Sequence, residues 1–185
     1  MRKIVSSIVA VFAAALIAAS AATPAVAQQP WAEREQLEKK VRKELVTLPW
    51  YGVFDNLEYA IDGSTVTLSG QVVQPSTRRD AERRVRKLKG VERVVNNIEV
   101  LPLSGFDDSI RRATYRALFG WNSPLFRYGR GVNPSIHIVV NRGHVTLEGV
   151  VSNEGDANLA RIRALGVPGV FSVTNNLRAE NVRAR

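Results

Sequence analysis

The chain contains an internal repeat, and this repeat restricts the possible folds more than any other feature. Residues 66–100 align without a gap with residues 145–179, at an offset of 79 positions. Of these 35 aligned pairs, 12 are identical. The segment VTLSGQV at 66–72 returns as VTLEGVV at 145–151, and both copies end with a strand that contains Asn-Asn. The repeat indicates two copies of one small module rather than a single domain.

Hydrophobic periodicity predicts the same order of elements in both copies. For the first copy we expect a helix over 37–48, strands over 57–61 and 66–72, a helix over 75–89 and a strand over 94–100. For the second copy we expect a helix over 110–118, strands over 136–140 and 145–151, a helix over 153–165 and a strand over 170–177. In the second copy, we expect Asp107 or Asp108 to cap the first helix and Asn153 to cap the second.

The position of the second helix in each copy predicts the topology of the sheet. A helix between the second and third strands implies a parallel crossover, so each three-stranded sheet is mixed and both helices cover one face. The sequence therefore predicts an α+β fold of two tandem αββαβ modules. We place the first module at residues 28–101 and the second at residues 102–185.

The N-terminal residues have the composition of a secretory signal peptide. Arg2 and Lys3 precede an apolar run over residues 4–22, and Ala25-Val26-Ala27 fits a small-x-small cleavage site. We expect residues 1–27 to be removed after Ala27; the alternative is an uncleaved membrane anchor. The chain has no cysteine, which excludes disulfides, thiolate metal sites and a lipid-modified cysteine.

The repeated motif resembles the BON domain (bacterial OsmY and nodulation). The resemblance lies in Val-Thr-Leu-x-Gly-x-Val, a helix, and then Gly-Val-x-x-Val-x-Asn-x-Ile/Leu, at 63–100 and again at 142–179. It implies an αββαβ fold in a periplasmic protein of the osmotic or envelope stress response. It also implies phospholipid binding or chaperoning of exported outer-membrane proteins. Without a lipidated cysteine, the chain is more similar to the soluble tandem members of the family.

No group of residues in the sequence is typical of an enzyme. His137 falls in an alternating strand and His144 in the turn that follows it, and neither has further ligands at metal spacing. No nucleophile has a neighbouring base. We therefore expect no catalytic residues, no metal and no cofactor.

The charge of the chain favours an acidic partner. The formal net charge is +9, and the second module holds 11 arginines, no lysine and 6 acidic residues. Because we expect export, anionic phospholipid or another envelope polyanion is a better candidate than nucleic acid. Any contact with a membrane would be peripheral.

An aromatic and basic insertion in the second module is the first candidate site. The second copy is about ten residues longer than the first between its first helix and first strand. The residues of the insertion that we assign to a tentative lipid or partner site are Trp121, Leu125, Phe126, Arg127, Tyr128 and Arg130. Aromatic rings and arginines together are typical of a membrane interface. The alternative is that these rings close the end of the core, as Trp50, Tyr51 and Phe54 could do in the first copy.

The second helix of each copy gives two more candidate surfaces. In the first copy, Arg79, Arg83 and Arg86 form a tentative basic face opposite the apolar face. The aligned residues of the second copy are Asn158, Ile162 and Leu165, of which we add Ile162 and Leu165 to the candidate site. Packing inside the protein would explain this apolar face, and a partner or membrane surface is the alternative.

Two pairs of equivalent residues, one of glycines and one of asparagines, have structural interpretations. Gly70 and Gly149 lie inside strands, where we expect a helix to pack closely against them. Asn96 and Asn175 are expected to bond an unpaired edge or loop.

The leading hypothesis for function is reversible binding of anionic phospholipid in the periplasm, and the rival is a chaperone or protein-interaction module for exported chains.

Overall fold

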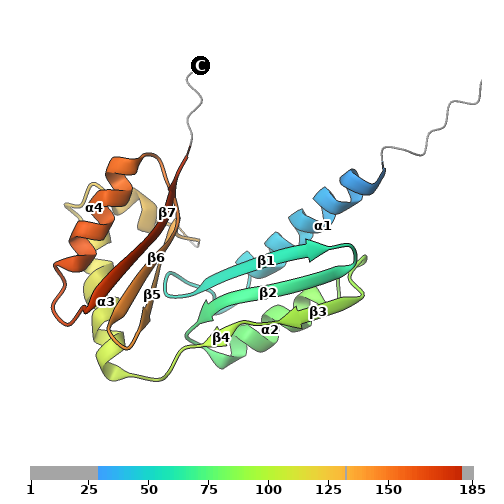
Figure 1. Ribbon diagram of the computed structural model, residues 1–185, viewed down its shortest axis with the longest axis horizontal. Helices are drawn as coiled ribbons and strands as arrows, with labels where there is room; N and C mark the ends of the chain where they lie inside the picture. The colour runs from blue at the N-terminus through green and yellow to red at the C-terminus, as the bar shows by residue number, and fades with distance from the viewer. Residues whose placement is uncertain (1–28, 132, 181–185) are drawn as a thin grey trace, which may run out of the picture.

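The computed structural model describes residues 29–131 and 133–180 (Figure 1). The first module contains α1 (Gln29–Val46), β1 (Asn56–Asp62), β2 (Thr65–Val72), α2 (Pro75–Val85), β3 (Arg93–Asn96) and β4 (Glu99–Val100). The second contains α3 (Gly105–Phe119), the 3-10 helix η1 (Phe126–Gly129), β5 (Ile136–Asn141), β6 (His144–Val151), α4 (Glu154–Leu165) and β7 (Ser172–Ala179). The expected signal peptide lies outside the described residues.

Both sheets are mixed and both have their helices on one face (Figure 1). In the first module β1 pairs antiparallel with β2, and β2 pairs parallel with β3 and β4. In the second module β5 pairs antiparallel with β6, and β6 pairs parallel with β7. The helices α1 and α2 contact each other behind the first sheet, and α3 and α4 do so behind the second. The predicted α+β architecture of two αββαβ modules is confirmed.

The last strand of the first module differs from the single strand that periodicity predicts. β3 ends at Asn96 and β4 begins at Glu99. Between them the Asn97 amide still bonds the Leu68 carbonyl over 2.8 Å, and the Ile98 amide, which faces away from β2, donates to the Asn96 side chain over 3.2 Å. The equivalent bond from Leu177 to Asn175 is 3.4 Å long, and there β7 stays continuous.

Each module has its own hydrophobic core, formed between its sheet and its two helices. The first core contains Leu37, Val41, Leu45, Leu48, Ile61, Val66, Leu68, Val72, Ala81, Val85 and Ile98. The second contains Ile110, Leu118, Phe119, Leu125, Tyr128, Ile136, Ile138, Val140, Val145, Leu147, Val151, Ala157, Ala160 and Ala164. Because there are two cores, each module buries apolar surface on its own, as a duplicated unit requires.

The repeated polar residues tie the helices to the sheet in the same way in both modules. The Asn96 side chain donates to the carbonyl of Arg78 in α2, and Asn175 donates to the carbonyl of Ala157 in α4. Both bonds are 3.1 Å long and their acceptors are 79 residues apart. These side chains therefore bond a neighbouring helix, as well as a backbone amide on their own strand.

A repeated arginine joins the two helices within each module. Arg84 of α2 donates to the carbonyl of Thr47, just after α1, and Arg163 of α4 donates to the carbonyl of Ala117 near the end of α3. Carbonyls at a helix C-terminus lack partners within the helix, and a guanidinium satisfies them well. The duplication thus extends to the bonds between helices.

The expectation that a helix packs on Gly70 and Gly149 is wrong, because the nearest backbone belongs to β1 in the first module and to Ser135, just before β5, in the second. A Cβ on Gly70 would lie 2.2 Å from the carbonyl oxygen of Asn56 in β1, and one on Gly149 would lie 2.0 Å from that of Ser135. Both glycines also have positive φ, +106° and +126°. Only glycine combines this backbone conformation with so close an approach.

The cap of α3 also differs from the prediction. Ser104 is the N-cap residue, and its side chain accepts a bond from the Asp107 amide. Asp107 is buried, and its carboxylate accepts bonds from the amides of Arg142 and Gly143 in the turn between β5 and β6. An aspartate in the first turn therefore holds a tertiary contact, whereas Asn153 caps α4 as predicted.

We expect Gly70→Ala to lower the free energy of unfolding by about 2–4 kcal/mol, because the methyl group meets backbone and the positive φ adds strain. Urea denaturation followed by circular dichroism measures this loss. Gly105→Ala is the control, since a Cβ there meets nothing within 4 Å. Equal stability of the two variants would contradict the proposed clash.

Candidate functional site

Part of the aromatic insertion belongs to the core of the second module. Leu125 and Tyr128, both assigned to the contact surface from the sequence, are buried. The Tyr128 hydroxyl donates to Asp156 over 2.6 Å and accepts from the Ser152 amide over 2.9 Å. Placing Leu125 and Tyr128 on the contact surface is therefore wrong, because these two side chains hold η1 against β6 and α4.

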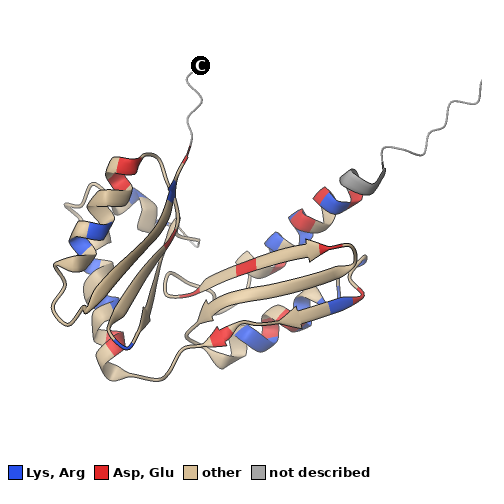
Figure 2. Cartoon of the chain, in the orientation of Figure 1, with Lys and Arg blue, Asp and Glu red and all other residues tan. Residues whose placement is uncertain are grey.

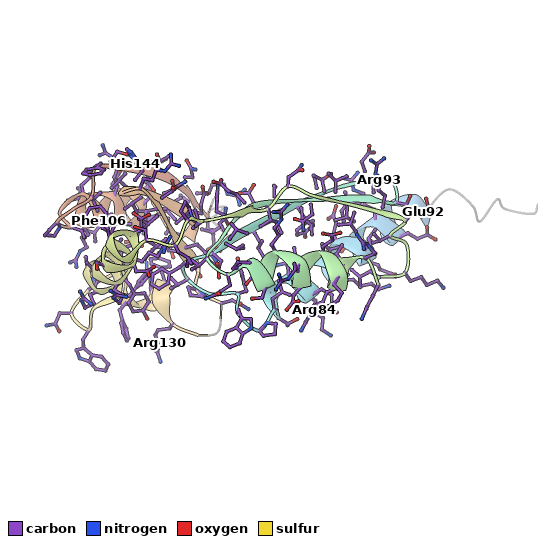
Figure 3. All side chains as sticks on the ribbon, turned by 90° about the horizontal axis from the view of Figure 1, so that it is seen from below. Arg84, Glu92, Arg93, Phe106, Arg130 and His144 are labelled. Carbon is purple, nitrogen blue, oxygen red and sulfur yellow. The ribbon has the colours of Figure 1, made fainter. Side chains whose placement is uncertain are left out.

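Three other candidate residues of the insertion reach the surface: Trp121 and Arg130 are exposed, and Phe126 is partly buried. Trp121 is 85% exposed and meets Phe126 edge to face, with ring centroids 5.4 Å apart. The Arg130 guanidinium carbon lies 5.7 Å from the centroid of the Phe126 ring. Figure 3 shows Arg130 at the edge of the second module, directed away from its body. Trp121, Phe126 and Arg130 thus form one surface cluster, here called the aromatic cluster.

Arg127 has a structural partner of its own. Its guanidinium bonds Asp156 over 2.5 Å and the Tyr128 hydroxyl over 2.8 Å. The Tyr128 hydroxyl, followed by Arg127 and Asn153, lowers the pKa of the Asp156 carboxyl. Because Asp156 already neutralises it, Arg127 contributes less free positive charge to the surface than Arg130.

The apolar face of α4 is not covered by any part of the chain that the structure describes. Ile162 is 63% exposed and Leu165 is 44% exposed, whereas Ala157, Ala160 and Ala164 face the core. Packing of Ile162 and Leu165 inside the protein, the preferred interpretation from sequence, is therefore wrong. The aligned arginines of α2 are exposed as well, so the same face of the second helix is exposed in both modules.

The basic face of α2 is partly neutralised. Arg83 pairs with Asp80 at 2.7 Å, and Arg86 pairs with Glu82. Figure 2 shows acidic residues between the basic ones along this helix. Arg79 is exposed and forms no ion pair with any other described residue. We conclude that α2 offers less net positive charge than its arginines alone indicate.

The aromatic segment that was expected to close the end of the first core joins the modules instead: Tyr51 packs on the first core, whereas Phe54 packs on the second and Trp50 is exposed. Residues 50–55 connect α1 to β1 and also contact β5, where the Ile138 amide donates to the Val53 carbonyl over 2.7 Å. Val53 and Phe54 pack on the second core, and Phe54 meets Tyr115 of α3 with ring centroids 6.2 Å apart. We call residues 50–55 the junction segment.

The junction segment also surrounds His137. Its Nε2 lies 3.4 Å from the Tyr51 hydroxyl, and its Nδ1 lies 3.2 Å from the Gly52 carbonyl oxygen. Burial lowers the pKa of His137, while burial raises the pKa of Tyr51 to about 12 and also raises the pKa of Asp55. The imidazole is thus neutral at neutral pH, in a contact that involves both modules.

The described residues contain no group of three or more histidine, cysteine or acidic side chains arranged to hold a metal ion. His144, the other histidine, is exposed and bonds the Ser172 hydroxyl. None of the helices that the structure describes is long and apolar enough to cross a membrane.

Comparison with known protein families identifies the fold. The model of the BON domain family matches residues 33–102 and 107–181, so the chain belongs to this family and carries two copies of its domain. Comparison with curated proteins gives no significant match.

Two solved structures are similar in part. One is from structural studies of CdsD, a structural protein of the type III secretion system of Chlamydia trachomatis. It is 11% identical over 79% of this chain and 94% of that chain, with a TM-score of 0.30. The second is the C-terminal domain of CdsD, which is 13% identical over 77% of this chain and 96% of that chain, with a TM-score of 0.28.

We expect the protein to lose stability as the pH falls from about 6.5 through the lower folded pKa of His137, because the unfolded chain binds the proton more readily. The groups around the His137 ring are Tyr51, the Asp55 backbone and Glu148 of β6, which is paired with His137 in the sheet. Urea midpoints at about pH 7.5 and about pH 5.5 measure the loss.

His137→Gln should reduce this loss, and the control His144→Gln, at an exposed ring, should retain it. An unchanged pH dependence in His137→Gln would contradict the assignment to the junction.

Proposed function

We propose that this protein is a non-enzymatic periplasmic component of the cell envelope that binds anionic phospholipid surfaces reversibly through its second module. Membership of the BON family supports a role associated with the envelope. The observation that carries the proposal is the aromatic cluster, in which an indole, a phenyl ring and a guanidinium are presented together.

The chemistry of the cluster suits the interfacial region of a bilayer. An indole favours the depth of the headgroups, and Trp121 is almost fully available to enter it. Arg130 can bond phosphate oxygens while it stays beside the Phe126 ring. The excess of arginine over acidic residues in the second module adds long-range attraction to an anionic surface.

The expected affinity is low, which fits a protein that leaves the membrane again. Each basic residue near an anionic surface contributes about 1 kcal/mol, and the attraction falls as salt screens it. Burial of one inserted indole adds a further favourable contribution to the free energy of binding. Attachment should therefore weaken steeply with ionic strength, unlike that of a lipidated or membrane-spanning protein.

Trp121→Ala combined with Arg130→Glu should abolish most binding to vesicles that contain phosphatidylglycerol, because it removes both the inserted ring and the charge of Arg130. Co-sedimentation at low and high salt measures this, with neutral phosphatidylcholine vesicles for comparison. We choose these two positions rather than Arg127, because Arg127 is bonded to Asp156 and its substitution would also affect the stability of the fold.

Arg79→Glu is the matched control, since it reverses one exposed charge in the first module. It should leave binding nearly unchanged. The proposal fails if wild-type protein sediments equally with anionic and neutral vesicles, or if the control loses as much binding as the double variant.

A second function, holding unfolded exported proteins, is supported by the exposed Ile162 and Leu165 on α4. Ile162→Asp should then reduce the suppression of aggregation of a denatured outer-membrane protein, as measured by light scattering, because the contact would be apolar. Asn158→Asp adds a charge at another exposed position of the same helix and should have little effect. No suppression by wild-type protein would rule out this function.

A further inference from the structure

The junction between the modules contains a groove that neither proposed function uses. Two adjoining cavities of about 340 and 410 Å³ share Val53, Phe54 and Arg112 in their walls. One extends toward Trp50 and the start of α3, and the other extends along α3 toward Tyr115 and Arg116. Cavities of this size match a small ligand and are too small for a folded partner.

The floor of the groove is apolar and held in place. Val53 is fixed by its backbone bond to β5, and Phe54 is packed on Tyr115 and on the second core. The ring of Tyr115 meets that of Phe119 in turn, with centroids 5.2 Å apart. Trp50, which is largely exposed, stands at one end. A carbon chain could therefore pack on an apolar surface that is already formed.

One wall of the groove is cationic and comes from a single helix. Arg112 and Arg116 are exposed one turn apart on α3, and neither forms an ion pair with another described residue. Arg111 also lines the groove but is only 3% exposed. Its two terminal nitrogens bond Asp108 and the Val140 carbonyl, while its buried Nε has no hydrogen-bond partner among the described residues.

The carboxylates in the same walls are already engaged. Asp108 pairs with Arg111. Asp55 accepts bonds from the amides of Gly52 and Val73, at 3.0 and 2.7 Å. Two guanidinium groups therefore remain to meet a ligand, beside an apolar floor. An anionic head could form charge-assisted hydrogen bonds with both of them, whereas a neutral or cationic ligand could not.

We propose that the groove binds one molecule of a single-chain anionic amphiphile. Its carboxylate or phosphate head would bond Arg112 and Arg116, and its carbon chain would lie on Val53, Phe54 and Tyr115. A fatty acid and a lysophospholipid share this chemistry. The site takes a free monomer, in contrast to the bilayer surface proposed for the aromatic cluster, and it does not depend on that function.

Isothermal titration with dodecanoate and dodecyl phosphate, both below their critical micelle concentrations, tests the site in the full mature chain. We expect one bound molecule per chain for at least one of them, and the preferred head identifies the source. Dodecanol, with the same chain and no charge, should bind much more weakly. Arg112→Glu with Arg116→Glu should weaken binding at least about tenfold, since two charge-assisted bonds are lost.

Arg161→Glu with Arg178→Glu is the matched control, because it changes the charge of the same module equally at exposed positions outside the groove. It should keep the affinity, as should Trp121→Ala. The proposal is overturned if wild-type protein binds neither amphiphile, if dodecanol binds as tightly as dodecanoate, or if the control loses as much affinity as the groove variant. It is also overturned if Arg112→Glu with Arg116→Glu affects only sedimentation with phosphatidylglycerol vesicles.

Discussion

The two modules are joined through the junction segment, whose backbone bond runs from the Ile138 amide to the Val53 carbonyl. β5 is an edge strand, and an edge strand presents unpaired amides and carbonyls that other chains can bond. The junction segment satisfies one of these groups and at the same time places Phe54 on the second core. A polar bond and apolar burial therefore act at the same place. Domains connected by a short linker alone would move relative to each other.

This contact also explains why the groove lies where it does. Residues 50–55 belong to the chain of the first module, but their side chains line a surface whose opposite wall is α3. Neither module contains both walls. His137, a partly buried ring, bonds the Gly52 carbonyl of the same segment, so its protonation state and the shape of the groove depend on the same contact. Any ligand in the groove would favour the packed arrangement over a separated one.

The sequence predicted the fold well because duplication and periodicity are local signals. Two aligned copies had to bury the same alternating residues, and they do: Val66 and Leu68 are fully buried, as are the equivalent Val145 and Leu147. The prediction for Gly70 was wrong because a glycine in a strand indicates a close neighbour without identifying it. The strand across the sheet and a helix above it are equally compatible with the pattern. Only the register of β1 against β2 decides between them.

The candidate site was harder to predict, for a different physical reason. Aromatic side chains suit both a core and a membrane interface, so composition could not separate Tyr128 from Trp121. The spacing of Leu125 and Tyr128, one helical turn apart, was a signal that these two share a buried face. No comparable signal existed for the junction segment, because Val53 and Ile138 are 85 residues apart and belong to different copies. Aligning the two copies identifies the contacts that both modules share. The junction is a contact between the modules, so it has no equivalent within either copy.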